Sequence, residues 1–495
     1  MGRVRIMKDY LKMTALEIGE GIRNKEFTSP EITGAFLENI SVKDALINAY
    51  ITVCREAALE RAWEVQKLID RGMLASPLAG VPVALKDNIC TKGIRTTCAS
   101  GMLRDFVPPY SATAAERLEN AGAVIIGKLN MDEFAMGSTS ETSFFGAVKN
   151  PWELRRVPGG SSGGAAAAIA AGEAVCALGS DTGGSIRQPA AYCGITGFKP
   201  SYGTVSRYGL IAYASSFDQI GPMAKDTADC AAIMDIISGR DEKDSTSLRL
   251  SDDMYSGKIT GSIKGMKVAL PEECFGEGVT CDIRENVLAA AEVLRSMGAV
   301  IEKISLPFME YVVPAYYIMA SAEASSNLSR FDGVKYGFRA ADYDGLQDMY
   351  EKTRSEGFGF EVKKRILLGT FVLSSGYYDA YYKKSMQVRA LIKRGFDDIF
   401  SKYDLIMTPT APVTAPMLTE SLKDPLKMYL SDIFTVSANM AGLPAVSLPC
   451  GSDRNGLPTG AQLMGAHMSD AKVLRAGCAY QTVTDYHRHL PPEGR

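Results

Sequence analysis

The stretch PGGSSGGAAAAIAAGEAVCALGSDTGGSIRQPA, residues 158–190, decides how this chain is interpreted. It holds eight glycines and four serines around an alanine-rich run. Such a composition is typical of flexible linkers, but glycine also permits backbone angles and close approaches that other residues do not allow. The run AAAAIAAG follows GGSSGG directly and predicts a helix of small residues that packs closely against a sheet. We therefore interpret the stretch as part of a packed functional site.

The composition is that of a large folded protein. The chain has 495 residues, of which 46% are apolar and 22% charged, and its formal net charge is −3. This balance argues against a broad basic surface for nucleic acid. The ten cysteines form no C-x-x-C pair, which favours a reducing, cytoplasmic compartment. We expect no membrane segment and no secretory signal, while Met1 and Met7 both remain possible starts.

The order of apolar runs predicts an α/β fold. A strand is expected to end near Lys86, another at 124–127, and residues 266–307 read as strand, helix and strand. Late apolar runs at 403–412, 443–451 and 458–465 are typical of strands covered on both faces. We expect a large, mostly parallel or mixed central sheet with helices on both faces. The chain then forms one domain, with a helical segment at 1–70, a core at 71–230, the rest of the sheet and the substrate pocket at 231–480, and a tail at 481–495.

Several common chemistries lack the residues they need. The only histidines are His467, His487 and His489, all in the last 29 residues, so a Ser-His-Asp triad and a zinc site are both disfavoured. No G-x-x-x-x-G-K-[ST] phosphate loop occurs. The GGSSGG segment could still hold an anion through backbone N–H groups, and a non-catalytic anion-binding module remains an alternative.

A serine nucleophile with a lysine base fits the remaining residues. Ser185 follows Thr182, Gly183 and Gly184, where small residues let backbone N–H groups point toward the volume that the serine hydroxyl faces. Such donors form an oxyanion hole. Lys86 ends an apolar strand, and a desolvated lysine can lose its charge and accept a proton.

These residues occur in a recognisable order. The segments VALKDNI, GGSSGG and GSDTGGSIR resemble the signature of the amidase signature family, and the resemblance covers nearly the whole chain. It implies the fold of that family and a Ser-Ser-Lys triad. In that triad Ser185 is the nucleophile, Ser161 is the bridging serine after a cis Gly160–Ser161 bond, and Lys86 is the base. The N–H groups of residues 182–185 would hold the oxyanion of an acyl transfer that releases ammonia.

One branch of the family is more similar than the rest. The segments NMDEFAMGSTSETSFFG, EVKKRILLGTFVLSSGYYDAYYKK and YLSDIFTVSANMAGLPAVSLPCG resemble the glutamine-hydrolysing subunits of tRNA-dependent amidotransferases. This resemblance implies a glutamine pocket in which Arg365 binds the α-carboxylate, Asp432 binds the α-ammonium and Tyr316 lines the wall. It implies no metal at the site.

The same resemblance implies a complex. Ammonia would pass to a larger GatB-like subunit that amidates mischarged glutamyl-tRNA, and a small GatC-like subunit would complete a heterotrimer. ATP and magnesium would be used by the partner, with no cofactor in this chain and no membrane contact. Whether aspartyl-tRNA(Asn) is also a substrate stays open. A stand-alone amidase that acts on a small carboxamide is the alternative within the family.

Overall fold

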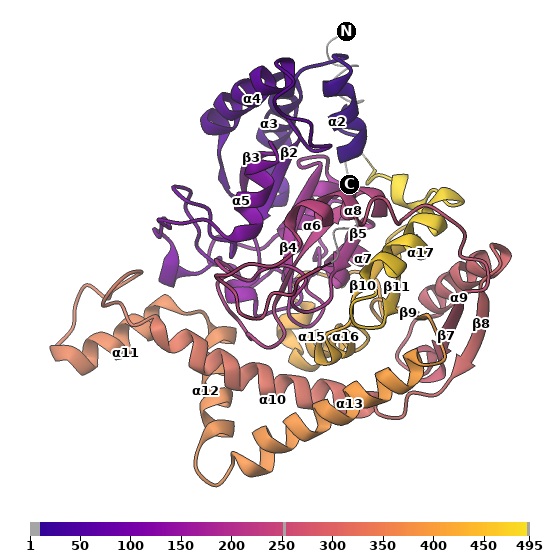
Figure 1. The fold of residues 1–495 in the computed structure, drawn as a ribbon. Helices are drawn as coiled ribbons and strands as arrows, with labels where there is room; N and C mark the ends of the chain where they lie inside the picture. The colour runs from indigo at the N-terminus through magenta and orange to yellow at the C-terminus, as the bar shows by residue number, and fades with distance from the viewer. Residues whose placement is uncertain (1–9, 251–253, 493–495) are drawn as a thin grey trace.

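The computed structural model describes residues 10–250 and 254–492 (Figure 1). Its centre is one 11-stranded sheet with the order β1-β3-β2-β4-β6-β5-β10-β11-β9-β7-β8. The strands are β1 (Tyr50–Val53), β2 (Pro82–Lys86), β3 (Val124–Leu129), β4 (Cys176–Asp181), β5 (Thr196–Lys199), β6 (Gln219–Ala224), β7 (Lys267–Pro271), β8 (Val300–Ile304), β9 (Leu405–Pro409), β10 (Ala445–Ser452) and β11 (Pro458–Gly465).

The sheet is mixed. Four pairings are parallel, β2 with β3 and β4, and β7 with β8 and β9. Six are antiparallel and hold the middle of the sheet together. Every residue of β2, β4, β6 and β11 is buried. Because successive side chains point to opposite faces, both faces of these strands are covered. The predicted α/β class is therefore confirmed, in its mixed form.

Helices cover the sheet and extend below it in Figure 1. Within the described residues, no helix is both long enough and apolar enough to cross a membrane. The helices are α2 (Ala15–Arg23), α3 (Ser29–Ile47), α4 (Arg55–Asp70), α5 (Thr113–Asn120), α6 (Gly163–Ala170), α7 (Arg187–Cys193), α8 (Thr227–Ile237), α9 (Cys281–Ser296), α10 (Met309–Asn327), α11 (Gly345–Gly357), α12 (Phe360–Leu373), the π-helical turn η5 (Asp379–Lys383), α13 (Lys384–Phe400), α14 (Glu420–Lys423), α15 (Pro425–Leu430), α16 (Val436–Ala441), α17 (Asp470–Thr482) and the short turn η6 (Tyr486–Arg488).

The N-terminal segment is helical, as expected, but it also contributes a strand. Helices α2 and α3 each begin with a capping box, formed by Thr14 with Glu17 and by Thr28 with Glu31. The prediction of a wholly helical 1–70 is wrong at β1, whose four residues pair with β3 at the edge of the sheet. A strand this short gives little alternation to detect in the sequence. Both candidate start residues, Met1 and Met7, lie outside the described residues.

Helix α6 lies tight against the sheet, as the alanine run predicted. All eight of its residues are buried. A Cβ atom at Gly164 would overlap the Asn130 carbonyl oxygen and lie 2.6 Å from the Ala49 carbonyl oxygen. The Gly164 N–H donates to that same Asn130 oxygen at 3.1 Å. Glycine at this position therefore lets the helix begin against the ends of the neighbouring strands, which places GGSSGG beside β2 and β4.

We expect Gly164→Ala to destabilise the protein by about 1–3 kcal/mol, since the added methyl group meets backbone atoms that cannot move independently. Gly34→Ala is the matched control, because Gly34 lies within α3 with no other atom near its Cβ position. That change should be neutral or stabilise by up to about 1 kcal/mol. Thermal unfolding of both variants measures the difference, and equal effects would contradict the close approach at Gly164.

Candidate active site

Lys86 is a buried amine at the end of β2, between its parallel neighbours β3 and β4. Its side chain is fully buried. Nζ donates to Ser161 Oγ at 2.7 Å, to Ser162 Oγ at 2.9 Å and to the Ser180 carbonyl oxygen at 3.3 Å. Burial lowers the pKa of Lys86 from 10.5 to about 7, although nearby carboxylates oppose this shift. A large fraction of the amine is then uncharged near neutral pH, as a base must be.

The GGSSGG segment brings a second hydroxyl to this amine. The Gly160–Ser161 peptide bond is cis, as the family resemblance implies. The Gly160 N–H donates to Gln188 Oε1 at 2.9 Å, which anchors the loop to α7. The Ser162 N–H donates to the Ser185 carbonyl oxygen at 3.1 Å. Ser161 therefore contacts Lys86, and its neighbour in the chain contacts the backbone of Ser185.

The turn between β4 and α7 presents unused N–H groups. Asp181 ends β4, and its carboxylate accepts the Gly184 N–H at 2.8 Å. Among the described residues, no acceptor is assigned to the N–H groups of Thr182, Gly183 or Ser185. Gly184 was also predicted to line the oxyanion hole, but its N–H is engaged by Asp181. The hydrogen bonding therefore supports three donors and not Gly184.

Ser185 lies beside the other two triad residues without completing the chain of hydrogen bonds. Its side chain is 8% exposed, and its hydroxyl is hydrogen-bonded to none of the described residues. The structure therefore contains the Lys86–Ser161 contact of the predicted triad and places Ser185 next to it through the backbone. The Ser161–Ser185 hydroxyl contact is not formed here.

The predicted pocket residues meet the nucleophile turn at its two glycines. A Cβ atom at Gly183 would lie 2.6 Å from the hydroxyl oxygen of Tyr316, which comes from α10. A Cβ atom at Gly184 would lie 3.4 Å from Asp432 Oδ1. Asp432 Oδ2 accepts a hydrogen bond from Ser138, whereas Oδ1 is buried with no partner among the described residues. Burial raises the pKa of Asp432 to about 8.

Arg365 is held in a fixed orientation on α12. Nε donates to Glu361 Oε1 at 2.8 Å and Nη1 donates to the Tyr213 hydroxyl at 2.5 Å. The rings of Tyr213, Tyr317 and Tyr429 lie 5.1–5.7 Å from the guanidinium carbon. Among the described residues Nη2 has no acceptor, so it is the nitrogen available to an anion. Arg365 is also near enough to lower the pKa of Asp432 against the effect of burial.

Comparison with known proteins agrees with this arrangement. A sequence model of the family described as Amidase matches residues 31–474. The chain belongs to the amidase family. Two relatives carry the name of a glutamyl-tRNA(Gln) amidotransferase component, the one designated GatA. The one from Lachnospira eligens is 58% identical over 471 residues, 95% of this chain and 98% of that protein. The one from Agathobacter rectalis is 56% identical over 480 residues, 97% of this chain and 95% of that protein.

A solved structure has the same fold. The crystal structure of the GatA component of glutamyl-tRNA(Gln) amidotransferase from Thermotoga maritima superposes with a TM-score of 0.79 at 42% sequence identity, and the match covers 97% of each protein. The family, the fold and the resemblance seen in the sequence are thus confirmed. The roles of individual residues rest on the geometry described above.

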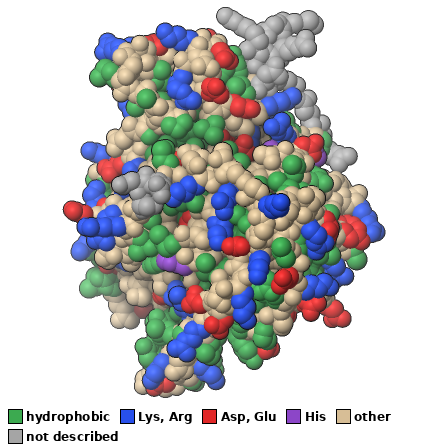
Figure 2. Space-filling view, turned by 45° about the vertical axis from the view of Figure 1, so that its right-hand side comes forward, with side chains coloured by type: hydrophobic (Ala, Val, Ile, Leu, Met, Phe, Trp, Pro, Cys, Tyr) green, Lys and Arg blue, Asp and Glu red, His purple; other side chains and the backbone are tan. Residues whose placement is uncertain are grey.

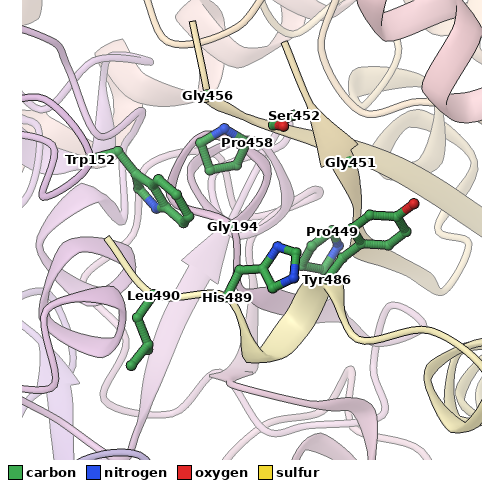
Figure 3. A pocket seen from close by; sticks show the side chains of 10 residues that line it. All are labelled: Trp152, Gly194, Pro449, Gly451, Ser452, Gly456, Pro458, Tyr486, His489 and Leu490. Carbon is green, nitrogen blue, oxygen red and sulfur yellow. The ribbon is translucent and has the colours of Figure 1, made fainter. Parts of the chain in front are cut away.

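The hollow shown in Figure 3 lies away from this amidase site. Its volume is about 360 Å³, and none of the predicted site residues lines it. The C-terminal tail, expected to be frayed, instead forms η6 and covers one side of it. The lining residues are Trp152, Gly194, Pro449, Gly451, Ser452, Gly456, Pro458, Tyr486, His489 and Leu490. His489 faces Asp485 at 3.6 Å, so it takes no part in the serine chemistry.

A second cavity of about 360 Å³ adjoins the active site. Ser138 and Gln188 line it, and these are the side chains that bond Asp432 and the Gly160 N–H. The buried hydroxyls of Thr139 and Tyr192 also line it and have no hydrogen-bond partner. The cavity therefore gives the pocket polar walls. Among the described residues, no group of His, Cys, Asp and Glu could hold a metal ion.

Several residues of the site were not predicted from the sequence. Ser162 shares the Lys86 amine with Ser161, and Ser138 holds Asp432. Tyrosines surround Arg365, although aromatic residues in a sequence indicate a core more often than a site. The one available signal was the segment AYASSFDQIGPMA at 212–224, which matches the family and contains Tyr213.

The pKa of Lys86 predicts a pH dependence. Because the uncharged amine is the active form, kcat/KM for amide hydrolysis should rise with pH and reach half its plateau near pH 7. Initial rates from pH 5.5 to 9 measure this limb. Ser185→Ala is the control and should reduce the rate at every pH by at least about a thousandfold. A rate independent of pH across this range would exclude Lys86 as the base.

Proposed function

We propose that this amidase is the glutamine-hydrolysing subunit of a tRNA-dependent amidotransferase that acts on glutamyl-tRNA(Gln). The observation that carries the proposal is the pair of opposite charges at the nucleophile turn. Asp432 Oδ1 is unpartnered beside Gly184, and Arg365 has one free nitrogen within electrostatic range of Asp432. Free glutamine carries an α-ammonium and an α-carboxylate, so these two groups fit its two charges. The names of the relatives support the same substrate.

The reaction follows from the positions of three side chains. The Ser185 hydroxyl passes its proton to Ser161, whose own proton moves to Lys86 Nζ, and Oγ of Ser185 bonds to the carboxamide carbon. The N–H groups of Thr182, Gly183 and Ser185 stabilise the oxyanion. The carbon–nitrogen bond then breaks, and the proton returns from Lys86 to the leaving nitrogen, which departs as ammonia.

Water completes the cycle. The ester that links the glutamyl group to Ser185 is attacked by a water molecule that loses its proton along the same route. Glutamate leaves, and the serine hydroxyl is restored. The ammonia is used by a partner subunit, where ATP and magnesium activate the glutamyl group of the tRNA. Aspartyl-tRNA(Asn) would present the same carboxylate chemistry to that partner.

A partner also suits the surface of the helical layer. Phe360, Leu367 and Phe371 lie on one face of α12 at spacings of seven and four residues, and Phe360 and Leu367 are 79% and 71% exposed. Tyr377 packs on Phe371 and Tyr381 follows it in η5. In Figure 2, hydrophobic and basic side chains are mixed at the lower end of the molecule, which this hairpin forms in Figure 1. An exposed apolar stripe of this kind favours a protein partner.

Arg365→Leu tests the glutamine pocket. Removing a charged hydrogen bond to the α-carboxylate should lower kcat/KM for glutamine by roughly 10–100-fold, mostly through KM. Lys363→Leu is the matched control, since Lys363 lies two residues away on the same helix and its Nζ donates to Ser355. Ammonia release from glutamine measures both. An unchanged KM in Arg365→Leu would favour a stand-alone amidase for small carboxamides.

Phe360→Glu with Leu367→Glu tests the partner surface. Two buried charges at an apolar interface should abolish copurification of the other subunits and glutamine-dependent amidation of glutamyl-tRNA. Trp63→Glu is the control, because Trp63 is also exposed, at 57%, but lies on α4 at the opposite end of the molecule (Figure 1). Normal assembly of the double variant would rule out this surface as the interface, and wild-type protein without partners or tRNA amidation would overturn the proposed function itself.

A further inference from the structure

A buried carboxylate that the mechanism does not use joins the two halves of the site. Asp218 precedes β6 and is 3% exposed. Oδ1 accepts the Thr182 hydroxyl at 2.7 Å and Oδ2 accepts the Tyr213 N–H at 2.9 Å. The Ala214 N–H adds a further bond at 3.1 Å. One carboxylate thus binds both the nucleophile turn and the loop that carries Tyr213.

Tyr213 carries this contact onward to Arg365. Its hydroxyl accepts Nη1 of Arg365 at 2.5 Å, and its ring lies 5.7 Å from the guanidinium carbon. With Nε held by Glu361, the guanidinium cannot rotate, and Nη2 is the nitrogen left for substrate. The direction of Nη2 therefore depends on where Tyr213 is held, and Tyr213 is held by Asp218.

We infer that Asp218 is a positioning residue that couples Arg365 to the oxyanion turn through Tyr213 and Thr182. The inference rests on the proposed function, in which Arg365 receives the α-carboxylate of glutamine. A carboxylate bound at Nη2 fixes the guanidinium, and the chain of hydrogen bonds transmits this constraint to Thr182, whose N–H faces the oxyanion. Attack on the amide is then favoured when the substrate carries an α-carboxylate, so the coupling contributes to substrate specificity.

A double-mutant cycle tests the coupling. Thr182→Val removes the hydroxyl at one end of the chain of hydrogen bonds, and Tyr213→Phe removes the hydroxyl at the other. Each should lower kcat/KM for glutamine by about tenfold, the value of a buried hydrogen bond to a charged or polar partner. If Asp218 couples them, the double variant loses less than the product of the two single losses, because cutting either link already uncouples the ends. Single losses that multiply in the double variant would overturn the inference.

Asp218→Asn supplies the second measurement. The amide has the shape of the carboxylate but only one acceptor oxygen, so it cannot accept all of these bonds. In this variant kcat/KM for glutamine should fall to the level of the double variant, while kcat/KM for butanamide, which lacks both charged groups, should fall several-fold less. Equal losses for the two substrates, or a further tenfold loss when Thr182→Val is added, would mean that Asp218 serves only to hold the fold.

Tyr202→Phe is the matched control. The Tyr202 hydroxyl donates to the Ser215 carbonyl oxygen at 2.9 Å, so it braces the same loop without contacting Arg365 or Asp218. Its kcat/KM for glutamine should stay within about threefold of the wild type, and a tenfold loss there would show that any loosening of the loop mimics the effect. All variants are assayed as the full chain with the subunits it copurifies with, and a wild-type protein without glutamine hydrolysis would overturn the proposed function and this inference together.

Discussion

The site depends on a lysine that is buried without a carboxylate to neutralise it. Two lysines are fully buried side by side in the sheet, Lys86 on β2 and Lys128 on β3. Lys128 Nζ lies 3.6 Å from Asp87 Oδ1 and forms a buried ion pair. Lys86 instead meets two hydroxyls and a carbonyl oxygen. Neutral acceptors compensate less of the desolvation cost of an ammonium, so the proton on Lys86 is held loosely. The difference in partners separates a structural lysine from a base.

The parallel pairing of β2 with β4 explains how distant residues reach that amine. Leu85 is in register with Leu178, so both strands run toward the same edge of the sheet. Lys86 ends one strand, and the turn with Ser185 follows the other, which brings together residues 99 positions apart. Helix α6 fits between them because Gly164 has no side chain. The order of the signature along the chain is thus a consequence of strands that end at one edge.

Residues with a local physical requirement could be predicted from the sequence, and residues that depend on remote contacts could not. The runs at 266–307 and 443–465 gave the correct elements because strand and helix periods are local properties. The pairing of Lys86 with Ser161 came from the family resemblance and has a hydrogen bond in the structure. By contrast, nothing near Gly184 indicates that Asp181 engages its N–H, and nothing near Tyr213 indicates Arg365. These contacts exist only once the sheet has formed.

The two parts of the site meet where side chains are absent. The reacting groups lie on residues 86–185, whereas the groups that recognise charge come from the helical layer and the loops around it. Tyr316 and Thr435 occupy the places where Gly183 and Gly184 would otherwise carry Cβ atoms. Any larger residue there would push the recognising layer away from Ser185 and separate substrate charge from the amide carbon. The glycines of the turn therefore serve two purposes, since they expose the backbone N–H groups and also set the distance between chemistry and recognition.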